Sequence, residues 1–141
     1  VITKLPSHDH LLFLGDLVGY GPQPNEVVEQ LQQLQPTIVL MGNHDYAVST
    51  GDASGFSSYA EKAVRWTRSQ ITPQNLNYLS TLPSSAKIEL NHTGLALFHG
   101  SPRDSLNEYI FPGISVPAAR QLIQTADSAI VLLGHTHMPM L

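Results

Sequence analysis

Four short runs of apolar residues in this chain each end at a Gly or a His. The runs cover residues 11–14, 38–41, 95–98 and 130–133. Short apolar runs bounded in this way are typical of strands that are buried on both faces of a parallel-type sheet. Ligands of such sheets bind beyond the carboxyl ends of the strands. The pattern therefore predicts an α/β fold whose chemistry gathers at one edge of one sheet.

Between these runs, apolar residues recur at the spacing of a helix. Pro24 and Asn25 open a segment whose apolar positions, from Val27 to Leu34, share one helical face before Pro36 ends it. Together with the runs on either side, this segment predicts a β-α-β unit. The same periodicity and capping signals predict further helices over residues 59–71, 73–82 and 117–125.

Turn-forming residues mark the remaining connections. The sequence Asn91-His92-Thr93-Gly94 lies between two strand-like segments, residues 88–90 and 95–98, which predicts a hairpin. Residues 49–58 are rich in Gly and Ser and predict a mobile loop that is suited to act as a lid. No repeat or linker interrupts the sequence, so we expect residues 1–141 to form a single domain.

The composition limits the classes of function. A chain of 141 residues with 42% hydrophobic content is long enough for one core. The formal net charge is −4 and the Lys and Arg residues are scattered, so we expect no binding to nucleic acid. The absence of Cys excludes thiolate metal sites and fits a reducing compartment. No apolar stretch approaches the roughly 18 residues of a membrane span, and we expect a cytoplasmic protein without membrane attachment.

Side chains that bind metals follow the apolar runs. Asp16 and Asn43 come just after the first two runs, and His99 and His135 follow the last two. Carboxylate, amide and imidazole ligands suit Mn²⁺, Fe²⁺ or Zn²⁺ better than Ca²⁺. A single His after a strand is more often a cap or a backbone hydrogen-bond partner, but the recurrence after four runs favours a metal site. The histidines outside these motifs lie in polar, turn-like stretches and are expected in solvent: His8, His10 and His92.

Two of the motifs suggest finer geometry. Residues i and i+2 of an extended segment point to the same side, so His135 and His137 are expected to face one site. In the second motif, the amide oxygen of Asn43 can bind a metal while His44 is free to donate a proton. Asp45 is then available to orient His44. The alternative for this second motif is a simple Asn-rich turn.

Four ordered motifs span nearly the whole chain: Gly15-Asp16-Leu17-Val18-Gly19-Tyr20-Gly21-Pro22, Gly42-Asn43-His44-Asp45, His99-Gly100-Ser101-Pro102 and Gly134-His135-Thr136-His137. In this order they resemble the calcineurin-like metallophosphoesterases, and more narrowly a small bacterial branch similar to phosphodiesterases and serine/threonine phosphatases. The resemblance implies a four-layer α-β-β-α sandwich and two divalent metal ions, Mn, Fe or Zn. It also implies that Asp16 bridges the two metals and that His137 binds one of them. The ligands that complete the other metal would be Asn43, His99 and His135.

One departure from the family pattern concerns the first motif. The family begins with an Asp-x-His after an initial strand, and this motif is absent from the chain. Residues 1–5 resemble the tail of the helix that normally follows it, and His8-Asp9-His10 precedes a strand instead of ending one. The chain also stops four residues after His137, where relatives continue into further strands. We therefore expect a fold that lacks its first and its C-terminal strands.

The implied reaction is the hydrolysis of a small phosphomonoester or phosphodiester by a water that two cations activate. His44 would stabilise or protonate the leaving oxygen, a role generally worth about 10² to 10⁴ in rate. Arg103 is a candidate to bind a phosphate oxygen, and a surface ion pair with Asp104 is the alternative. Tyr20, Asn43 and His44 are expected to contact the substrate, although a plain strand-to-helix connection explains Tyr20 nearly as well.

Two rival classes share these motifs. Some relatives are scaffolds that bind partner proteins on a degraded metal site, and they typically lose the residue equivalent to His44. Its presence here favours an enzyme, whereas the missing first motif favours a scaffold. Nucleases of the superfamily carry basic grooves, which this acidic chain lacks. The sequence does not choose among monoesters, diesters, nucleotides and phosphoproteins as substrates.

Overall fold

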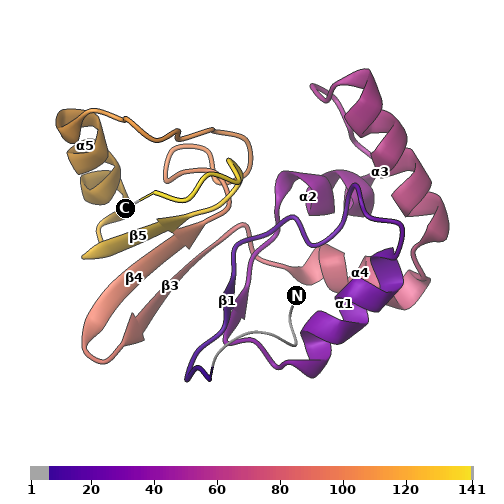
Figure 1. The fold of residues 1–141 in the computed structure, drawn as a ribbon, viewed down its shortest axis with the longest axis horizontal. Helices are drawn as coiled ribbons and strands as arrows, with labels where there is room; N and C mark the ends of the chain where they lie inside the picture. The colour runs from indigo at the N-terminus through magenta and orange to yellow at the C-terminus, as the bar shows by residue number, and fades with distance from the viewer. Residues whose placement is uncertain (1–6, 141) are drawn as a thin grey trace.

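The computed structural model describes residues 7–140, so the segment 1–5, expected to be the tail of a helix, lies outside the described residues. The structure contains both helices and strands, which confirms the predicted mixed α/β class (Figure 1). Their order along the chain is β1 (Leu12–Phe13), α1 (Pro24–Gln33), β2 (Ile38–Val39), α2 (Asn43–Thr50), α3 (Ser58–Gln70), α4 (Pro73–Thr81), β3 (Ser85–Leu90), β4 (Thr93–Phe98), α5 (Val116–Ala126) and β5 (Ile130–Leu133).

The first β-α-β unit forms as predicted. Strands β1 and β2 run parallel, with Leu12 opposite Ile38, and α1 makes the crossover between them. Pro24 occupies the first turn of α1, where the missing backbone N–H costs nothing. The apolar face of α1 carries Val28 and Leu31, which are almost fully buried. Both strands are shorter than the apolar runs that predicted them, because pairing stops where the chain turns toward Asp16 and Gly42.

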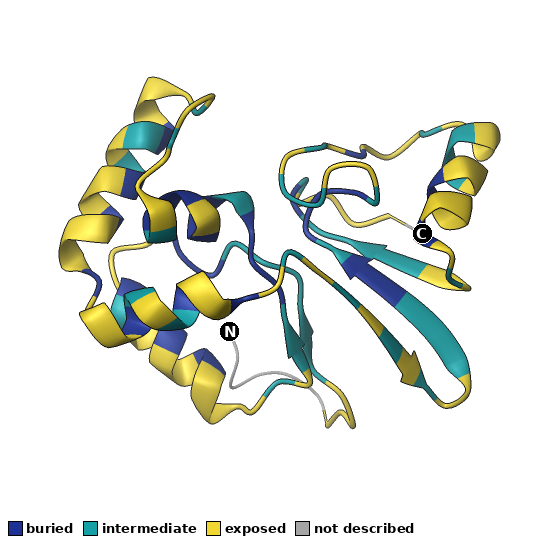
Figure 2. Ribbon diagram, turned by 180° about the vertical axis from the view of Figure 1, so that it is seen from behind, coloured by how far each residue is buried: buried dark blue, intermediate teal, exposed yellow. Residues whose placement is uncertain are grey.

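The helices α1 to α4 enclose the main hydrophobic core. Ser57 and Thr72 cap α3 and α4 by accepting hydrogen bonds from the backbone N–H groups of Ala60 and Asn75. The core is made of buried residues from the helices and the loops between them: Leu17, Val18, Val28, Leu31, Met41, Ala47, Val48, Val64, Ile71, Leu79 and Leu82. In Figure 2 the buried residues lie along the inner sides of these helices, while the outer turns are exposed. The apolar periodicity in the sequence therefore identified the inner faces.

Helix α2 was not predicted. The sequence offered a turn at Asn43 only as an alternative and predicted a loop from Ser49, whereas residues Asn43–Thr50 are helical. The start of the helix is held by one half of a capping box, since the carboxylate of Asp45 accepts a hydrogen bond from the backbone N–H of Gly42. It ends at Gly51, whose φ of +85° is a left-handed conformation that suits glycine. With eight residues and no clear apolar stripe, α2 gives no periodic signal in the sequence.

The hairpin is longer than the sequence predicted. β3 begins at Ser85 and β4 already at Thr93, so only Asn91 and His92 form the connection. Both of these residues have positive φ, 49° and 63°, which is the conformation of a tight two-residue turn. Strand β5 then pairs parallel to β4, and α5 packs on β5.

The strands form two sheets, as the four-layer sandwich implied by the family resemblance requires, instead of the single sheet that the apolar runs by themselves predicted. One sheet has the order β1-β2 and the other β3-β4-β5. Figure 1 shows four layers in sequence: helices α1 to α4, the small sheet, the larger sheet and α5. Direct backbone contacts join the two halves, because Met41 N–H donates to Pro83 O at 2.8 Å. The carboxyl ends of β1, β2, β4 and β5 consequently meet where the sheets adjoin, and not along one edge of one sheet.

Candidate metal centre

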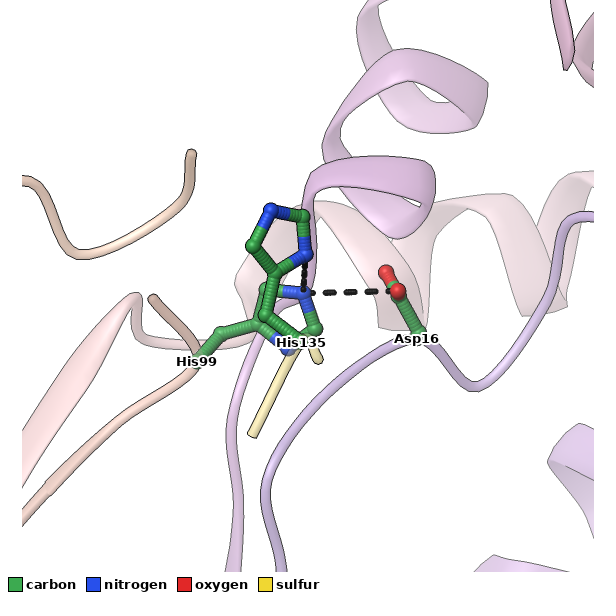
Figure 3. A group of neighbouring side chains, drawn as sticks. All are labelled: Asp16, His99 and His135. Carbon is green, nitrogen blue, oxygen red and sulfur yellow. Dashed lines mark hydrogen bonds and ion pairs between the residues drawn. The ribbon is translucent and has the colours of Figure 1, made fainter. Parts of the chain in front are cut away.

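Asp16 lies at the turn that follows β1, where the backbone is held in an unusual conformation. Gly15 and Asp16 both have positive φ, 95° and 57°. A Cβ on Gly15 would lie 2.7 Å from Gly42 N, so only glycine fits between the two turns. One oxygen of Asp16, Oδ1, accepts a hydrogen bond of 3.0 Å from the backbone N–H of His44. This bond fixes the carboxylate and leaves Oδ2 turned toward His99 (Figure 3).

The buried ring of His99 is the centre of the cluster. Its Nδ1 lies 2.6 Å from the carbonyl oxygen of Leu14, which can only accept, so Nδ1 carries the proton. Its Nε2 lies 3.3 Å from Asp16 Oδ2 and 3.2 Å from Asn43 Oδ1. The Nδ1 atom of His135 is 3.1 Å away from the same Nε2. Four side chains from four different turns therefore direct their ligand atoms to one point.

The spacing of these atoms suits a metal ion. Four ligands placed about 2.0 to 2.2 Å from a tetrahedral cation lie roughly 3.3 to 3.6 Å from one another. The three separations around His99 Nε2 are 3.1 to 3.3 Å. The bond from His99 Nδ1–H to a backbone carbonyl is the usual way in which a ligating imidazole is oriented. The structure thus brings together Asp16, Asn43, His99 and His135, all of which the sequence had selected as metal ligands.

The electrostatics of the cluster reflect the same convergence. Burial alone would raise the pKa of Asp16, but the hydrogen bond and the charge of His99 lower it below its ordinary value. Burial would lower the pKa of His99, yet its hydrogen bond and ion pair with Asp16 raise it. Burial and the neighbouring His99 lower the pKa of His135. The carboxylate of Asp16 therefore stabilises a positive charge at His99 Nε2. A cation bound by the same ligand atoms would be stabilised in the same way.

His137 does not join this cluster. It lines the same cavity as Asp16 and Asn43, but its side chain is exposed and it is outside the group formed by Asp16, His99 and His135. The expected extended geometry was wrong, because His135 and His137 have φ of 66° and 56° and the chain bends between them. A role for His137 in a second metal site remains a prediction.

His44 lies in the first turn of α2 and lines the cavity. Its Nδ1 is buried and has no hydrogen-bond partner among residues 7–140. The ring contacts two aromatic rings, with centroid distances of 4.7 Å to Tyr20 and 4.9 Å to Phe56. Burial lowers the pKa of His44, so the neutral imidazole predominates at neutral pH.

Asp45 has a different position from the one that the sequence suggested. It was expected to orient the ring of His44, but both of its oxygens accept backbone N–H groups instead. Oδ2 accepts from Gly42 at 2.8 Å and Oδ1 from Val18 at 3.0 Å. The side chain is fully buried, and burial raises its pKa to about 6 against these opposing hydrogen bonds. Asp45 thus ties the turn after β1 to the start of α2, which holds Asp16 beside Asn43.

Arg103 also has a different partner from the expected one. Its guanidinium pairs with Glu108, with Nε at 3.1 Å from both carboxylate oxygens, and not with Asp104. Asp104 accepts backbone N–H groups of Leu106 and Asn107. Arg103 is exposed and is not among the residues that line the cavity beside the cluster. A role in phosphate binding would require Arg103 to exchange Glu108 for the substrate, and it stays a prediction.

Two hollows open beside the cluster. One has a volume of about 420 Å³ and the other about 470 Å³, and both are lined by Tyr20, Asn43, His44, Tyr109 and His135. Tyr20 is therefore at the mouth, as the sequence suggested. Tyr109 was missed, and no signal in the sequence marks it, because it lies in the irregular segment between β4 and α5. Its ring stacks on His135 with a centroid distance of 3.7 Å.

The remaining histidines lie away from the site. His8, His10 and His92 are exposed, as predicted. The predicted loop is irregular only from Gly51 to Ser57, and Phe56 within it reaches the ring of His44. Its action as a lid stays a prediction. Within residues 7–140, no helix combines the length and the apolar character that crossing a membrane requires.

Comparison with known sequences identifies relatives of most of the chain. The family profile described as calcineurin-like phosphoesterase matches residues 1–139. An uncharacterized protein of Methanocaldococcus jannaschii is 32% identical over 128 residues, which cover 89% of this chain and 50% of that protein. The chain therefore spans about half the length of this relative.

Two solved structures share the fold. The crystal structure of a hypothetical protein from Pyrococcus horikoshii OT3 superposes with a TM-score of 0.85 at 19% identity, covering 95% of this chain and 59% of that chain. The crystal structure of a metallophosphoesterase from Sphaerobacter thermophilus superposes with a TM-score of 0.78 at 36% identity. That alignment covers 99% of this chain and 54% of the other. The predicted metallophosphoesterase-type fold is thereby confirmed.

Proposed function

This chain belongs to the calcineurin-like phosphoesterase family, and we propose that it carries most of an active centre for metal-dependent hydrolysis of phosphate esters. The observation that supports the proposal is the convergence of Asp16, Asn43 and His135 on the Nε2 atom of His99. This set of oxygen and nitrogen ligands suits Mn²⁺, Fe²⁺ or Zn²⁺. When bound, two such cations would polarise the phosphoryl group and make water a nucleophile at neutral pH.

The residues around the cluster would orient the ester. Tyr20, Asn43 and His44 line the cavity beside the cluster, so they are positioned to contact the phosphoryl group and the leaving group. Asp45 would contribute by holding the two turns together, since both of its oxygens are engaged by backbone N–H groups.

His44 would donate a hydrogen bond or a proton to the leaving oxygen. Its buried Nδ1 has no acceptor within the described chain, so the neutral ring favours the tautomer that carries its proton on Nε2. Burial keeps the ring neutral by lowering its pKa. A neutral imidazole with the proton on Nε2 would donate a hydrogen bond that stabilises the leaving oxygen, whereas proton transfer to that oxygen would come from the protonated ring, which becomes more populated as the pH falls. This role would not require His44 to bind a metal.

The chain holds fewer groups for a second metal. Asp16 and His137 are the candidates that the family resemblance assigns to it, and the Asp-x-His motif is absent. Two protein ligands hold a divalent cation only weakly against water. We therefore infer one tightly bound metal per chain of this sequence and slow, metal-dependent hydrolysis.

The experiment measures metal content and hydrolysis together. The purified chain is dialysed against Mn²⁺, analysed for bound metal and assayed with bis-p-nitrophenyl phosphate and p-nitrophenyl phosphate. We expect close to one Mn²⁺ per chain, and hydrolysis that EDTA abolishes. In His99→Ala both should be lost, while the matched control His92→Ala, whose ring is exposed, should keep both.

Three outcomes would contradict parts of this proposal. Absence of bound metal, or hydrolysis that is indifferent to EDTA, would exclude a metal-dependent phosphoesterase. Two tightly held metals with fast turnover would mean that other residues replace the missing Asp-x-His. Bound metal with no hydrolysis of either ester would favour the alternative function, a scaffold of the same fold. The sparse second ligand set is the observation that keeps this alternative open.

A further inference from the structure

Two series of aromatic rings lead outward from the candidate metal centre. On one side Tyr20 contacts His44 and lies nearly parallel to Tyr59, with a centroid distance of 5.8 Å and an angle of 19°. On the other side Tyr109 stacks on His135 at 3.7 Å and lies parallel to Phe111 at 5.6 Å and 5°. Each series therefore begins at a histidine of the site and continues through two further rings.

The tyrosine and phenylalanine rings of the two series are exposed, although contact between large apolar rings and water is unfavourable. The exposed fractions are 56% for Tyr20, 74% for Tyr59, 53% for Tyr109 and 54% for Phe111. Tyr20 and Tyr109 both line the two hollows that meet at Asn43, His44 and His135. The hollows have volumes of about 420 and 470 Å³, within the range of small-molecule sites, which is about 300 to 1,000 Å³.

The hollows offer little to a highly charged substrate. Among the described residues that line them, none is a Lys or an Arg. Arg103, the nearest candidate from the sequence, is paired with Glu108. A chain of phosphates would therefore find no cationic side chains beyond the metal centre, whereas a single phosphoryl group needs only the centre itself.

From these observations we propose that the site takes a nucleoside monophosphate, with the phosphoryl group at the metal centre and the base against Tyr20 or Tyr109. This inference rests on the proposed function for the position of the phosphoryl group. A sugar separates the base of a nucleotide from its phosphate, so the base reaches outward along the aromatic series. A simple alkyl phosphate would leave these rings in water. Stacking of a base on an aromatic side chain is tolerant of base identity, so we expect purines and pyrimidines to bind comparably.

The test compares two ligands that differ only in the base. Dissociation constants of AMP and ribose 5-phosphate are measured by calorimetry on the Mn²⁺-loaded chain and again with EDTA present. We expect AMP to bind roughly 5- to 150-fold more tightly than ribose 5-phosphate, the range that base–aromatic stacking gives. In the double variant Tyr20→Leu and Tyr109→Leu this ratio should fall close to 1, because the rings are lost while the phosphate ligands remain.

Two further variants serve as controls. Tyr109→Phe keeps the ring and should keep the ratio. Tyr46→Leu removes an exposed tyrosine of α2 that lines neither hollow, and it should also leave the ratio unchanged. Equal binding of AMP and ribose 5-phosphate by the unaltered chain, no measurable binding of either, or a ratio that survives the double variant would each overturn the inference.

The result is separable from that of the proposed function. A chain that prefers AMP to ribose 5-phosphate but hydrolyses no ester would contradict the proposed function and support the aromatic base site. Metal-dependent hydrolysis of AMP and ribose 5-phosphate with equal kcat/KM and equal affinity would support the proposed function and contradict the aromatic base site. The ratio is informative even if a variant misfolds, because the unaltered chain alone tests it.

Discussion

Single residues in this site owe their orientation to backbone groups more than to one another. His99 donates from Nδ1 to a carbonyl that belongs to residue Leu14, 85 positions earlier in the chain. Asp16 is held by the N–H of His44, and Asp45 by the N–H groups of Gly42 and Val18. Because backbone groups are fixed by the fold, these hydrogen bonds restrict the orientations of the side chains in the site.

The first prediction at this scale concerns His44. We expect His44→Ala to keep its metal, because the four ligand atoms around His99 Nε2 come from other residues. Its kcat for aryl phosphates should fall about 10²- to 10⁴-fold, the usual contribution of a positioned proton donor. Elemental analysis and kcat are measured on the same preparation. Loss of metal together with the imidazole would identify His44 as a ligand and refute the assignment.

At the scale of elements, α2 is the piece that connects the motifs. This helix carries Asn43 and His44 in its first turn, and its capping residue Asp45 also accepts from the loop after β1. Gly42 allows the close contact, because a Cβ there would lie 2.2 Å from Asp16 N. The position of α2 therefore determines the positions of three candidate site residues, Asn43, His44 and Asp16. Its stability and that of the site should change together.

The second prediction concerns the titration of Asp45. Its pKa is about 6 in the fold, above the ordinary value of 3.8, so the folded state favours the protonated carboxyl. The stabilising contribution is fully present below about pH 4 and is lost as the pH rises through 6, by up to roughly 3 kcal/mol. Asp45→Asn cannot ionise, so its free energy of unfolding should rise relative to the unaltered chain between pH 4 and 7.

The measurement is urea unfolding of both proteins across this pH range with EDTA present. Metal binding is then excluded, and the titrations of Asp16 and His99 are common to both proteins. The difference between the two unfolding free energies isolates Asp45. A difference that moves in favour of the unaltered chain as the pH rises would show that the hydrogen bonds from Gly42 and Val18 outweigh the cost of burying the charge.

At the scale of the whole molecule, the site lies where two sheets and their helices meet. The main hydrophobic core is in the half formed by α1 to α4, while His99 and His135 come from the other half. Contacts across the junction include His99 Nδ1–H to Leu14 O at 2.6 Å and Met41 N–H to Pro83 O at 2.8 Å. Metal binding should therefore stabilise the junction, since its ligands come from both sides.

The third prediction is made at this scale and concerns nucleic acid. The formal net charge is −4, with seven Lys and Arg residues against eleven Asp and Glu. Such a surface releases few counterions from DNA, so we expect no measurable binding to duplex DNA at low salt in a filter-binding titration. Micromolar binding that weakens steeply as salt is added would contradict this prediction. Binding of AMP, the proposed small ligand, is measured on the same preparation as a control that the protein is active.

The sequence by itself predicted most of the local elements and selected the candidate metal ligands. The apolar runs predicted four strands, and the helical spacing of apolar residues predicted α1, α3, α4 and α5. This spacing arises because a helix that is buried on one face carries apolar residues at regular intervals. The positions of Asp16, Asn43, His99 and His135 after those runs were sufficient to select them. Short-range signals also account for the caps at Ser57 and Thr72. These features depend on residues within a few positions of each other.

Only the tertiary structure decided how the elements combine and which polar groups become partners. The strands pair into two sheets, α2 forms without an apolar stripe, and Asp45 and Arg103 bind groups that the sequence did not suggest. Tyr109 reaches His135 from an irregular segment that carries no periodic signal. The physical reason is that each of these features depends on contacts across the fold or on backbone angles such as the positive φ of Asp16 and His135. Strand pairing and backbone conformation determine which groups come into contact when the chain folds. Local sequence patterns do not encode these contacts.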